Sequence, residues 1–204
     1  MHWVSQAQVY SDPPQQGQGK GEQHWLPVTL GPIMAAAQRD LRLISPYFVP
    51  GAEGVRWLGG MRARGVEVGV LTNSLAANDV VAVHGGYAGY RKPLLEAGVE
   101  LFELMPHGQS NSSLFGSSGA SLHTKAFAVD GETGFIGSFN MDPRSVSLNT
   151  EMGVVFQDRE VTAELLKSYA SKTAAANSYR VALEQGALRW QDGSVEPPKV
   201  WTHE

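Results

Sequence analysis

The chain has 204 residues, enough for one large domain or two small ones and for a substantial hydrophobic core. Hydrophobic residues make up 42% and charged residues 18%, which is typical of a globular protein and excludes a disordered one. The formal net charge of −4 gives no overall attraction to nucleic acid or to an anionic membrane. The absence of cysteine excludes disulfides and thiolate metal sites, and it leaves the cellular compartment open.

The ends of the chain give little sign of targeting. No apolar run approaches the ~18 residues of a membrane span, and the first residues do not resemble a signal peptide, so we expect a soluble chain. The first ten residues lack an evident helix cap, and the last ones, "PPKVWTHE", stop within a pattern. We therefore expect this chain to be a piece of a longer polypeptide.

Gly, Pro and Gln dominate residues 11–24, "SDPPQQGQGKGEQH", which predicts a flexible loop after a short N-terminal strand. The piece "GQGKG" lacks the spacing of a phosphate-binding loop, and no strand leads into it. We therefore assign residues 1–26 to an N-terminal strand and loop, and residues 27–204 to a single domain.

The order of elements predicts an α/β fold. The first part of the chain predicts three helix–strand pairs. In chain order they are a helix over 27–40 and a strand over 41–46, a helix over 52–65 and a strand over 66–72, and a helix over 79–98 and a strand over 99–104. After a polar loop over 106–121, we expect strands over 122–129, 134–140 and 149–157, a helix over 159–177 and a final strand pair. Helices spaced between short apolar strands indicate a mixed β-sheet flanked by helices on both faces.

The strand predicted over 122–129 carries two basic side chains within the apolar run "SLHTKAFAVD". Charged groups are seldom buried without partners, so either this segment is not a buried strand or its polar face holds an anion. Side chains alternate along a strand, so His123 and Lys125 share one face, roughly 6.6 Å apart. The following Asp-Gly predicts a hairpin. A two-residue turn would place His123 opposite Asn140 and Lys125 opposite Ser138.

These four polar groups suit a tetrahedral anion. Lys125 supplies a point charge, Asn140 an amide donor and Ser138 a hydroxyl. The imidazole of His123 can be neutral at cellular pH and can act as a nucleophile. One histidine alone would favour a structural role, but four convergent groups favour a binding site.

The pattern His123-x-Lys125-x4-Asp130, followed by "GSFN" at 137–140, resembles the HKD motif of the phospholipase D superfamily. The stretches "LISPYFVPG", "GVELFEL" and "NMDPRSVSLNTE" are similar to the second half of bacterial cardiolipin synthases. The resemblance covers nearly the whole chain and implies a phospholipase D-like α-β-α sandwich with one HKD motif. Enzymes of this family use two such motifs.

The resemblance also implies roles for the site residues. His123 would attack phosphorus and form a phosphohistidine, while Lys125, Asn140 and Ser138 would hold the phosphate oxygens. Glu151 stands where the family places an acidic residue, and it would accept the other ring N–H of His123. No cofactor and no metal are expected, because Lys125 already supplies the positive charge.

Asp130, the last residue of the motif, belongs to the catalytic candidates, although its position separates it from the others. Seven residues of extended chain place it roughly 23 Å from His123. We therefore expect Asp130 to form the turn, or to make an ion pair across an interface between two motifs.

Two further groups are candidates for lining the pocket. His84, Tyr87, Tyr90 and Arg91 recur at helical spacing, and they either line the pocket or form a helix face packed on the sheet with Arg91 in solvent. Arg144 is expected to hold the loop after the active strand, and a direct contact with substrate is the weaker alternative.

Three functions fit these residues. By resemblance, the chain is half of a phosphatidyltransferase or phospholipase D that acts on phospholipids, peripheral to the bacterial inner membrane on its cytoplasmic side. Its partners would be a phospholipid, the membrane surface and a second HKD half, from the same parent chain or from a second copy. A homodimeric single-motif nuclease is the second function, which the net charge of −4 disfavours. A non-catalytic phosphate-binding half is the third, and the complete residue set argues against it.

Either enzyme needs a proton donor opposite the nucleophile, because an alkoxide is a poor leaving group at neutral pH. His123 cannot attack phosphorus and also protonate the leaving oxygen behind it. The chain has no other His-x-Lys pair. We therefore expect the isolated chain to be inactive on phospholipids.

Overall fold

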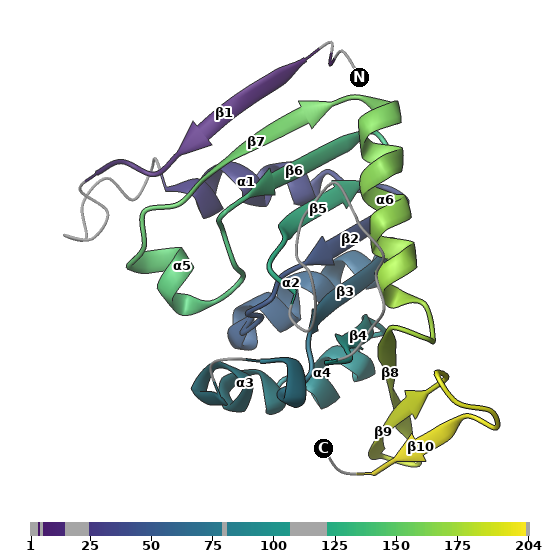
Figure 1. Ribbon diagram of the computed structural model, residues 1–204. Helices are drawn as coiled ribbons and strands as arrows, with labels where there is room; N and C mark the ends of the chain where they lie inside the picture. Colours follow the sequence, from purple (N-terminus) through teal and green to yellow (C-terminus); the bar gives the residue numbers. More distant parts are fainter. Residues whose placement is uncertain (1–3, 5, 15–24, 79–80, 107–121, 203–204) are drawn as a thin grey trace.

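Ten strands form one sheet in the order β1-β7-β6-β5-β2-β3-β4-β8-β9-β10 (Figure 1). The computed structural model describes residues 4, 6–14, 25–78, 81–106 and 122–202. Pairing is parallel among β2, β3 and β4 and antiparallel elsewhere. The strands are Ala7–Ser11 (β1), Asp40–Ile44 (β2), Glu67–Asn73 (β3), Glu100–Leu104 (β4), Lys125–Val129 (β5), Thr133–Gly137 (β6), Met152–Gln157 (β7), Ser178–Glu184 (β8), Ala187–Asp192 (β9) and Lys199–Trp201 (β10).

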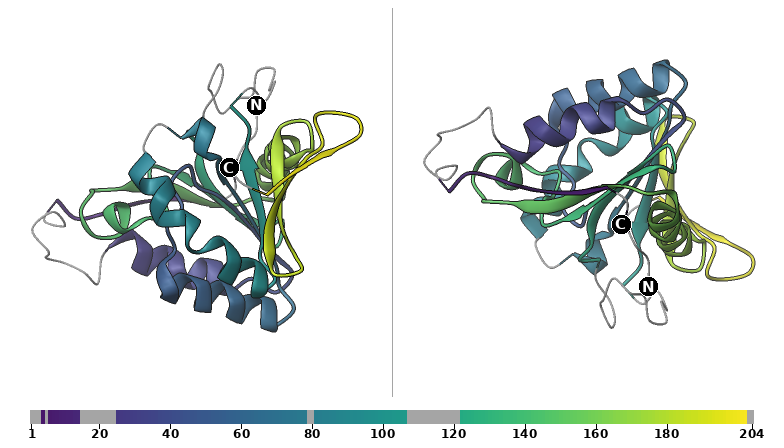
Figure 2. Two further views of the ribbon diagram at one scale, coloured as in Figure 1. Left: turned by 90° about the horizontal axis from the view of Figure 1, so that it is seen from below. Right: turned by 90° about the horizontal axis from the view of Figure 1, so that it is seen from above.

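Helices cover both faces of this sheet, as the sequence predicts. Figure 2 shows α1, α2 and α4 on one side and α6 on the other. The helices are Leu26–Ala35 (α1), Gly51–Ala63 (α2), Val81–Ala88 (α3), Arg91–Glu96 (α4), Pro143–Ser147 (α5) and Arg159–Thr173 (α6), with a 3₁₀ turn η3 at Leu75–Ala77. None of the described helices is long and apolar enough to cross a bilayer.

Two hydrophobic clusters hold the layers together. The larger one packs Leu30 of α1, Leu58 of α2 and Leu94 of α4 against the face of the sheet that includes Val70. The smaller one packs Leu165 of α6 and its neighbours on the other face. The strands between these layers are therefore buried on both sides, which explains their nearly continuous apolar sequences.

Several element boundaries differ from those predicted. Helix α1 ends at Ala35 rather than near residue 40, because the backbone from Gln38 to Asp40 donates hydrogen bonds to the side chain of Asp130. The single helix expected over 79–98 is two helices, and β8 was not predicted. The paired strands β9 and β10 confirm the expected C-terminal strand pair.

The N-terminal strand is an integral part of the sheet. Strand β1 pairs with β7 along its whole length, from Ala7 opposite Phe156 to Ser11 opposite Met152. The predicted boundary at residue 26 therefore separates a strand from the sheet to which it belongs. Most of the Gly/Pro/Gln-rich loop and most of the polar loop predicted over 106–121 lie outside the described residues.

Candidate active site

The predicted site residues gather at one edge of the sheet, where β5 begins and where β2 and β6 end. Strand β5 is antiparallel to both neighbours, so its first residue, Lys125, lies opposite Gly137 at the end of β6. His123 precedes β5 and is exposed, whereas Lys125 is 9% exposed. The ammonium of Lys125 donates to the carbonyl oxygen of His123 at 2.7 Å. The two basic residues of the motif are therefore neighbours in space.

Asn73, at the end of β3, holds the segment that carries His123. Its Oδ1 accepts the N–H of Leu122 at 2.9 Å, and its Nδ2 donates to the carbonyl of Leu122 at 3.4 Å. This buried amide takes the place of a strand partner, so β5 begins at Lys125 rather than at residue 122. Sequence reasoning missed Asn73, because no local pattern connects it to a residue 49 positions away.

The predicted register of the β5–β6 hairpin is wrong by one residue. Lys125 pairs with Gly137 rather than with Ser138, because the turn contains three residues, 130–132, instead of two. Asp130 takes a left-handed conformation, with φ of 53°, and ends the strand one residue early. A slip of one residue exchanges the two faces of a strand, so Gly137 shares the side of Lys125.

The glycine of "GSFN" is required by close packing. A Cβ atom on Gly137 would lie 2.4 Å from the carbonyl oxygen of Met152 and 2.6 Å from Cζ of Phe135. Such distances are well inside van der Waals contact, so no other residue fits without displacement of the backbone. The absence of a side chain at Gly137 therefore allows the end of β6 to pack directly on the backbone of β7, just before Ser138.

Ser138 and Glu151 form a hydrogen-bonded pair beside this edge. The hydroxyl of Ser138 donates to Oε2 of Glu151 and accepts the N–H of Met152 at 3.0 Å. The other carboxylate oxygen accepts from Nδ2 of Asn149 at 3.1 Å. No hydrogen bond joins the ring of His123 to Glu151 among the described residues; the buried carboxylate accepts from Ser138 and Asn149 instead.

Asp12, just after β1, supports Glu151 through the main chain. Its Oδ2 accepts the N–H of Glu151 at 2.7 Å, and its own N–H donates to the carbonyl of Glu151 at 2.8 Å. Its Oδ1 accepts the N–H of Leu26 at the start of α1. The N-terminal segment therefore helps to fix the acidic residue of the site, which its loop-like composition did not indicate.

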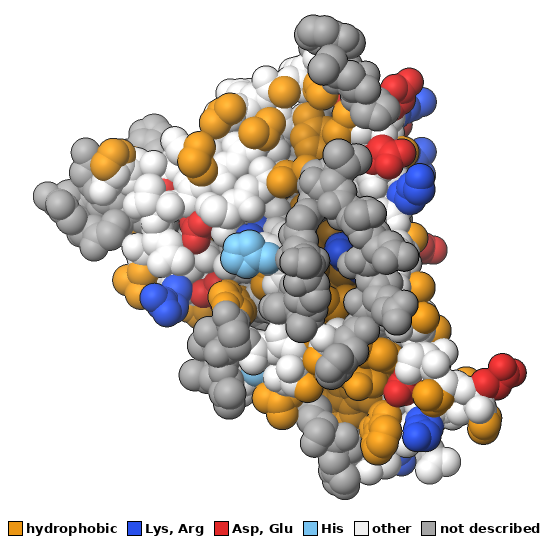
Figure 3. Space-filling view, viewed as in Figure 1, with side chains coloured by type: hydrophobic (Ala, Val, Ile, Leu, Met, Phe, Trp, Pro, Cys, Tyr) orange, Lys and Arg blue, Asp and Glu red, His pale blue; other side chains and the backbone are white. Residues whose placement is uncertain are grey.

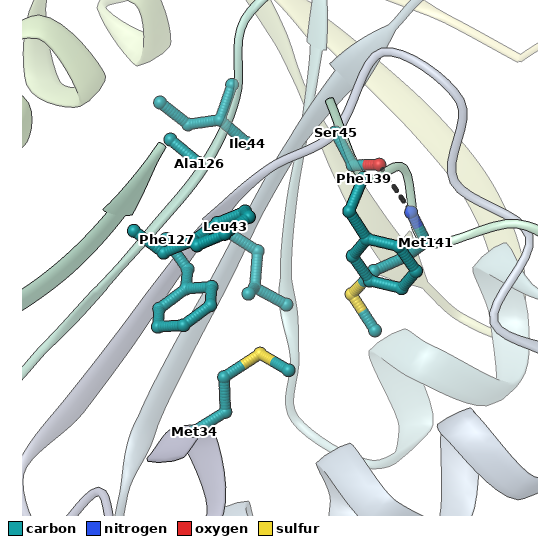
Figure 4. A pocket seen from close by; sticks show the side chains of 9 residues that line it. Met34, Leu43, Ile44, Ser45, Ala126, Phe127, Phe139 and Met141 are labelled. Carbon is teal, nitrogen blue, oxygen red and sulfur yellow. Dashed lines mark hydrogen bonds between the residues drawn. The ribbon is translucent and has the colours of Figure 1, made fainter. Parts of the chain in front are cut away.

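The loop after β6 places Asn140 next to the end of β2. Asn140 is buried, and its Oδ1 accepts the N–H of Tyr47 at 3.4 Å. The N–H of Met141 donates to Oγ of Ser45 at 3.0 Å, as Figure 4 shows. Beneath this loop lies an apolar cavity of about 20 Å³, partly lined by Phe139. With Oδ1 engaged, the amide NH₂ of Asn140 is the part that can donate to an anion.

Asp130 lies at the other end of β5, roughly 16 Å along the strand from Lys125. Its carboxylate accepts the N–H groups of Gln38, Arg39 and Asp40 at 2.7 to 3.2 Å. Partial burial raises the pKa of Asp130, but these backbone hydrogen bonds lower it more, so its pKa is below the ordinary value. Asp130 is the expected turn former and does not belong to the cluster around His123.

The candidate pocket residues of α3 and α4 form a buried network instead. Arg91 is 2% exposed, and its Nε donates to Oε1 of Glu103 at 2.7 Å. Its Nη2 lies 2.7 Å from Nε2 of His84, and its guanidinium stacks over Tyr87 at 4.6 Å. Trp190 donates to the other oxygen of Glu103 at 2.9 Å. The packed helix face was the correct alternative, but Arg91 is not in solvent, because this ion pair offsets its desolvation.

Arg144 holds the loop through its backbone. Its carbonyl accepts the N–H groups of Leu148 and Asn149 at 2.8 Å, while its side chain is exposed. The short helix α5 around it was missed in the sequence. The signal was present, because Asp142 caps the helix and proline occupies its first position.

No three His, Asp or Glu side chains gather as a metal site within the described ranges. The site as described therefore consists of one exposed histidine, one ammonium, one amide and the pair of the exposed Ser138 with the buried carboxylate of Glu151.

Comparisons with known proteins agree with this geometry. Residues 31–172 match the protein family described as "Cardiolipin synthase, PLD-like domain". The chain is 45% identical over 195 residues to cardiolipin synthase C of Escherichia coli (strain K12), covering 92% of this chain and 41% of that protein. It is 31% identical over 154 residues to cardiolipin synthase A of Proteus mirabilis (strain HI4320), covering 76% and 28%. The chain thus spans about two fifths or less of the length of these relatives.

Solved structures share the fold. Nuc from Salmonella typhimurium, a phospholipase D family member, superposes with a TM-score of 0.58 at 20% identity, covering 80% of this chain and 91% of Nuc. Phosphatidylserine synthase from Haemophilus influenzae superposes with a TM-score of 0.60 at 16% identity, covering 97% of this chain and 40% of the synthase.

Proposed function

The chain belongs to the cardiolipin synthase PLD-like domain family, and we propose that it is the C-terminal catalytic half of a phosphatidyltransferase. It acts on the phosphodiesters of phospholipids through a phosphohistidine intermediate. The observation that carries this proposal is the exposed His123, whose main-chain carbonyl accepts a hydrogen bond from the ammonium of Lys125, at the sheet edge where Asn140 is held.

The proposed reaction has two displacements at phosphorus. One ring nitrogen of His123 attacks, the bond from phosphorus to the alkoxide of the leaving alcohol breaks, and the phosphatidyl group stays on the imidazole. The oxygen of the acceptor, an alcohol or water, then displaces His123 and gives its proton to the group that protonated the leaving alkoxide. Lys125 and the amide NH₂ of Asn140 stabilise the charge on the non-bridging oxygens in both transition states.

Glu151 acts as a positioning residue in this proposal. Its carboxylate accepts hydrogen bonds from the hydroxyl of Ser138 and from the amide of Asn149, and its main-chain N–H donates to Asp12. The hydroxyl of Ser138 is thereby fixed beside the loop that carries Asn140. Such support is what keeps a site within the small tolerance that catalysis requires.

A second HKD half completes the site, because the leaving alkoxide needs an acid on the side opposite His123. The sheet face next to the site offers a surface for it. Val9 of β1 pairs with Val154 of β7, and these residues are 62% and 36% exposed. Met152 and Leu148 extend the same region and are 56% and 63% exposed. Figure 3 shows hydrophobic side chains over β1, β7 and β6, which is typical of a protein interface.

The second half comes from the same parent chain or from a second copy of this chain. The parent protein then works at the cytoplasmic side of the bacterial inner membrane, where its phospholipid substrate lies. The net charge of −4 makes the nuclease alternative the weaker one, because a nuclease site is expected to lie in a basic groove.

The test is an assay of labelled phosphatidylglycerol with the verified monomer and with the chain assembled with a second half. We expect turnover only in the assembly. We also expect the labelled phosphatidyl group to become covalently attached to the unmodified protein but not to the His123→Ala variant. Robust turnover by the monomer would contradict the need for a second half. No turnover and no labelled histidine in any assembly would contradict the proposed function, and cleavage of DNA with a steep salt dependence would favour the nuclease.

A further inference from the structure

A second hollow opens at the same edge of the sheet as His123, at the carboxyl ends of β3 and β4. Its volume is about 420 Å³, within the range of small-molecule sites. Its walls come from η3 and from the C-terminal strands. The lining residues are Ser74, Leu75, Ala76, Glu103, Tyr179, Trp190 and Trp201.

The chemistry of the walls selects an apolar ligand. Three aromatic side chains and Leu75 supply most of the surface. Glu103 is fully buried, and its carboxylate oxygens are engaged by Arg91 at 2.7 Å and by Trp190 at 2.9 Å. The described lining residues include no lysine or arginine, and an anion at this wall would meet the carboxylate of Glu103.

One of the aromatic walls, Trp190, is held firmly in place. The guanidinium of Arg91 stacks on the ring of Trp190 at 5.2 Å, and Trp190 is only 6% exposed. Burial raises the pKa of Tyr179, and the nearby Asp192 and Glu103 raise it further, so its phenol is neutral at cellular pH. Trp190 therefore forms a fixed apolar wall of the pocket, and the phenol of Tyr179 adds no charge to it.

The pocket lies within reach of the reacting phosphate. Ser74, on its wall, follows Asn73 directly, and Asn73 holds Leu122, the residue before His123. The strands β5, β2, β3 and β4 are consecutive neighbours in the sheet. Three steps between strands place β4 roughly 14 Å from β5, which an extended acyl chain attached to a phosphoglycerol can span.

We propose that this pocket binds one acyl chain of the phospholipid whose phosphodiester lies at His123. The proposal rests on the proposed function, because it takes the phosphate to be bound at Lys125. Burial of CH₂ groups against Trp190, Trp201 and Leu75 supplies affinity that the phosphate contacts alone do not provide. The pocket thus makes the site prefer a lipid to a free glycerophosphodiester.

The test compares soluble phosphatidylglycerols with two hexanoyl or two octanoyl chains, below their critical micelle concentrations, by isothermal titration calorimetry. Each additional CH₂ group buried in the pocket should strengthen binding about fourfold. The Trp201→Ala and Leu75→Ser variants should bring the affinity ratio of the two lipids close to one. Val200→Ala is the matched control, because Val200 is similarly exposed on β10 but points to the opposite side of the strand.

The outcomes separate this proposal from the function on which it rests. An affinity ratio near one in the unmodified chain, or the same ratio in Trp201→Ala and Val200→Ala, would overturn the acyl-chain pocket. Lys125→Ala should weaken the binding of both lipids and of glycerophosphoglycerol while the chain-length ratio persists. If Lys125→Ala leaves all three affinities unchanged while the chain-length ratio still depends on Trp201, phosphate binding at Lys125 is wrong and the apolar pocket stands.

Discussion

The two ends of strand β5 carry residues of one sequence motif but use them differently. At the first end, the exposed His123 and the ammonium of Lys125 lie at the edge of the sheet, near Asn140. At the other end, the carboxylate of Asp130 accepts three consecutive backbone N–H groups. A carboxylate that is saturated by the main chain stabilises the fold and has little capacity left for a substrate.

The comparison teaches that polar residues of a motif can be sorted by the partners they already have. Residues at the Lys125 end should control turnover, and Asp130 at the other end should control stability.

Lys125→Ala should lower turnover of the assembled enzyme on the order of 10³-fold, because it removes the positive charge that faces the phosphoryl group. The free energy of unfolding should fall by only about 1 kcal/mol, the typical effect of a single substitution. Initial rates and urea unfolding of the same preparation measure both quantities. A variant that loses stability but retains turnover would show that Lys125 stabilises the fold and does not act in the reaction.

Glu151→Gln should lower turnover on the order of 10²-fold while the fold stays intact. The reason is that an amide NH₂ would face either Ser138 or Asn149, which both donate to the carboxylate. The hydroxyl of Ser138 would then lose its orientation. Steady-state kinetics with a thermal melt as the control checks this, and unchanged turnover would remove Glu151 from the mechanism.

Asp130→Ala should destabilise the fold by about 2 kcal/mol, because three charge-assisted hydrogen bonds are lost. Turnover per folded molecule should not change. Asp130→Asn is the milder control, since asparagine tolerates the left-handed conformation that Asp130 adopts. A large loss of turnover in fully folded Asp130→Asn would place Asp130 in the chemistry after all.

The contribution of Asp130 should also depend on pH. Its pKa in the folded state is lowered from the ordinary value of 3.8, so folding favours the ionised carboxylate. The stabilisation is therefore complete above that value and is lost as the pH falls through the folded-state pKa. Urea unfolding from pH 7 to pH 2 should show the stability difference between the unmodified chain and Asp130→Asn shrinking below about pH 4.

Ser138→Ala should have the smallest effect on turnover, because Ser138 supports the site through Glu151 and also stabilises the main chain beside it. Its hydroxyl bonds to Glu151 and to the N–H of Met152. We expect a loss of about 1 kcal/mol in the free energy of unfolding and a fall in turnover of roughly tenfold or less. A fall as large as that of Lys125→Ala would show that Ser138 contacts the phosphate directly.

The local pattern of the sequence was sufficient for the type and order of most elements. Alternation of apolar segments predicted the mixed sheet with helices on both faces. The spacing of His123, Lys125 and "GSFN" predicted an anion site on one side of the hairpin, which stays a prediction. These features depend on side-chain periodicity and on neighbours within a few residues, which a single sequence displays.

The tertiary structure decided the hairpin register, the supports of the site and the burial of Arg91. The three-residue turn follows from Asp130 binding the backbone around residue 39, some 90 positions away. Asn73 reaches Leu122 across 49 positions, and Asp12 reaches Glu151 across 139 positions. Such hydrogen bonds join segments that meet only when the sheet has formed, so no local period or spacing encodes them.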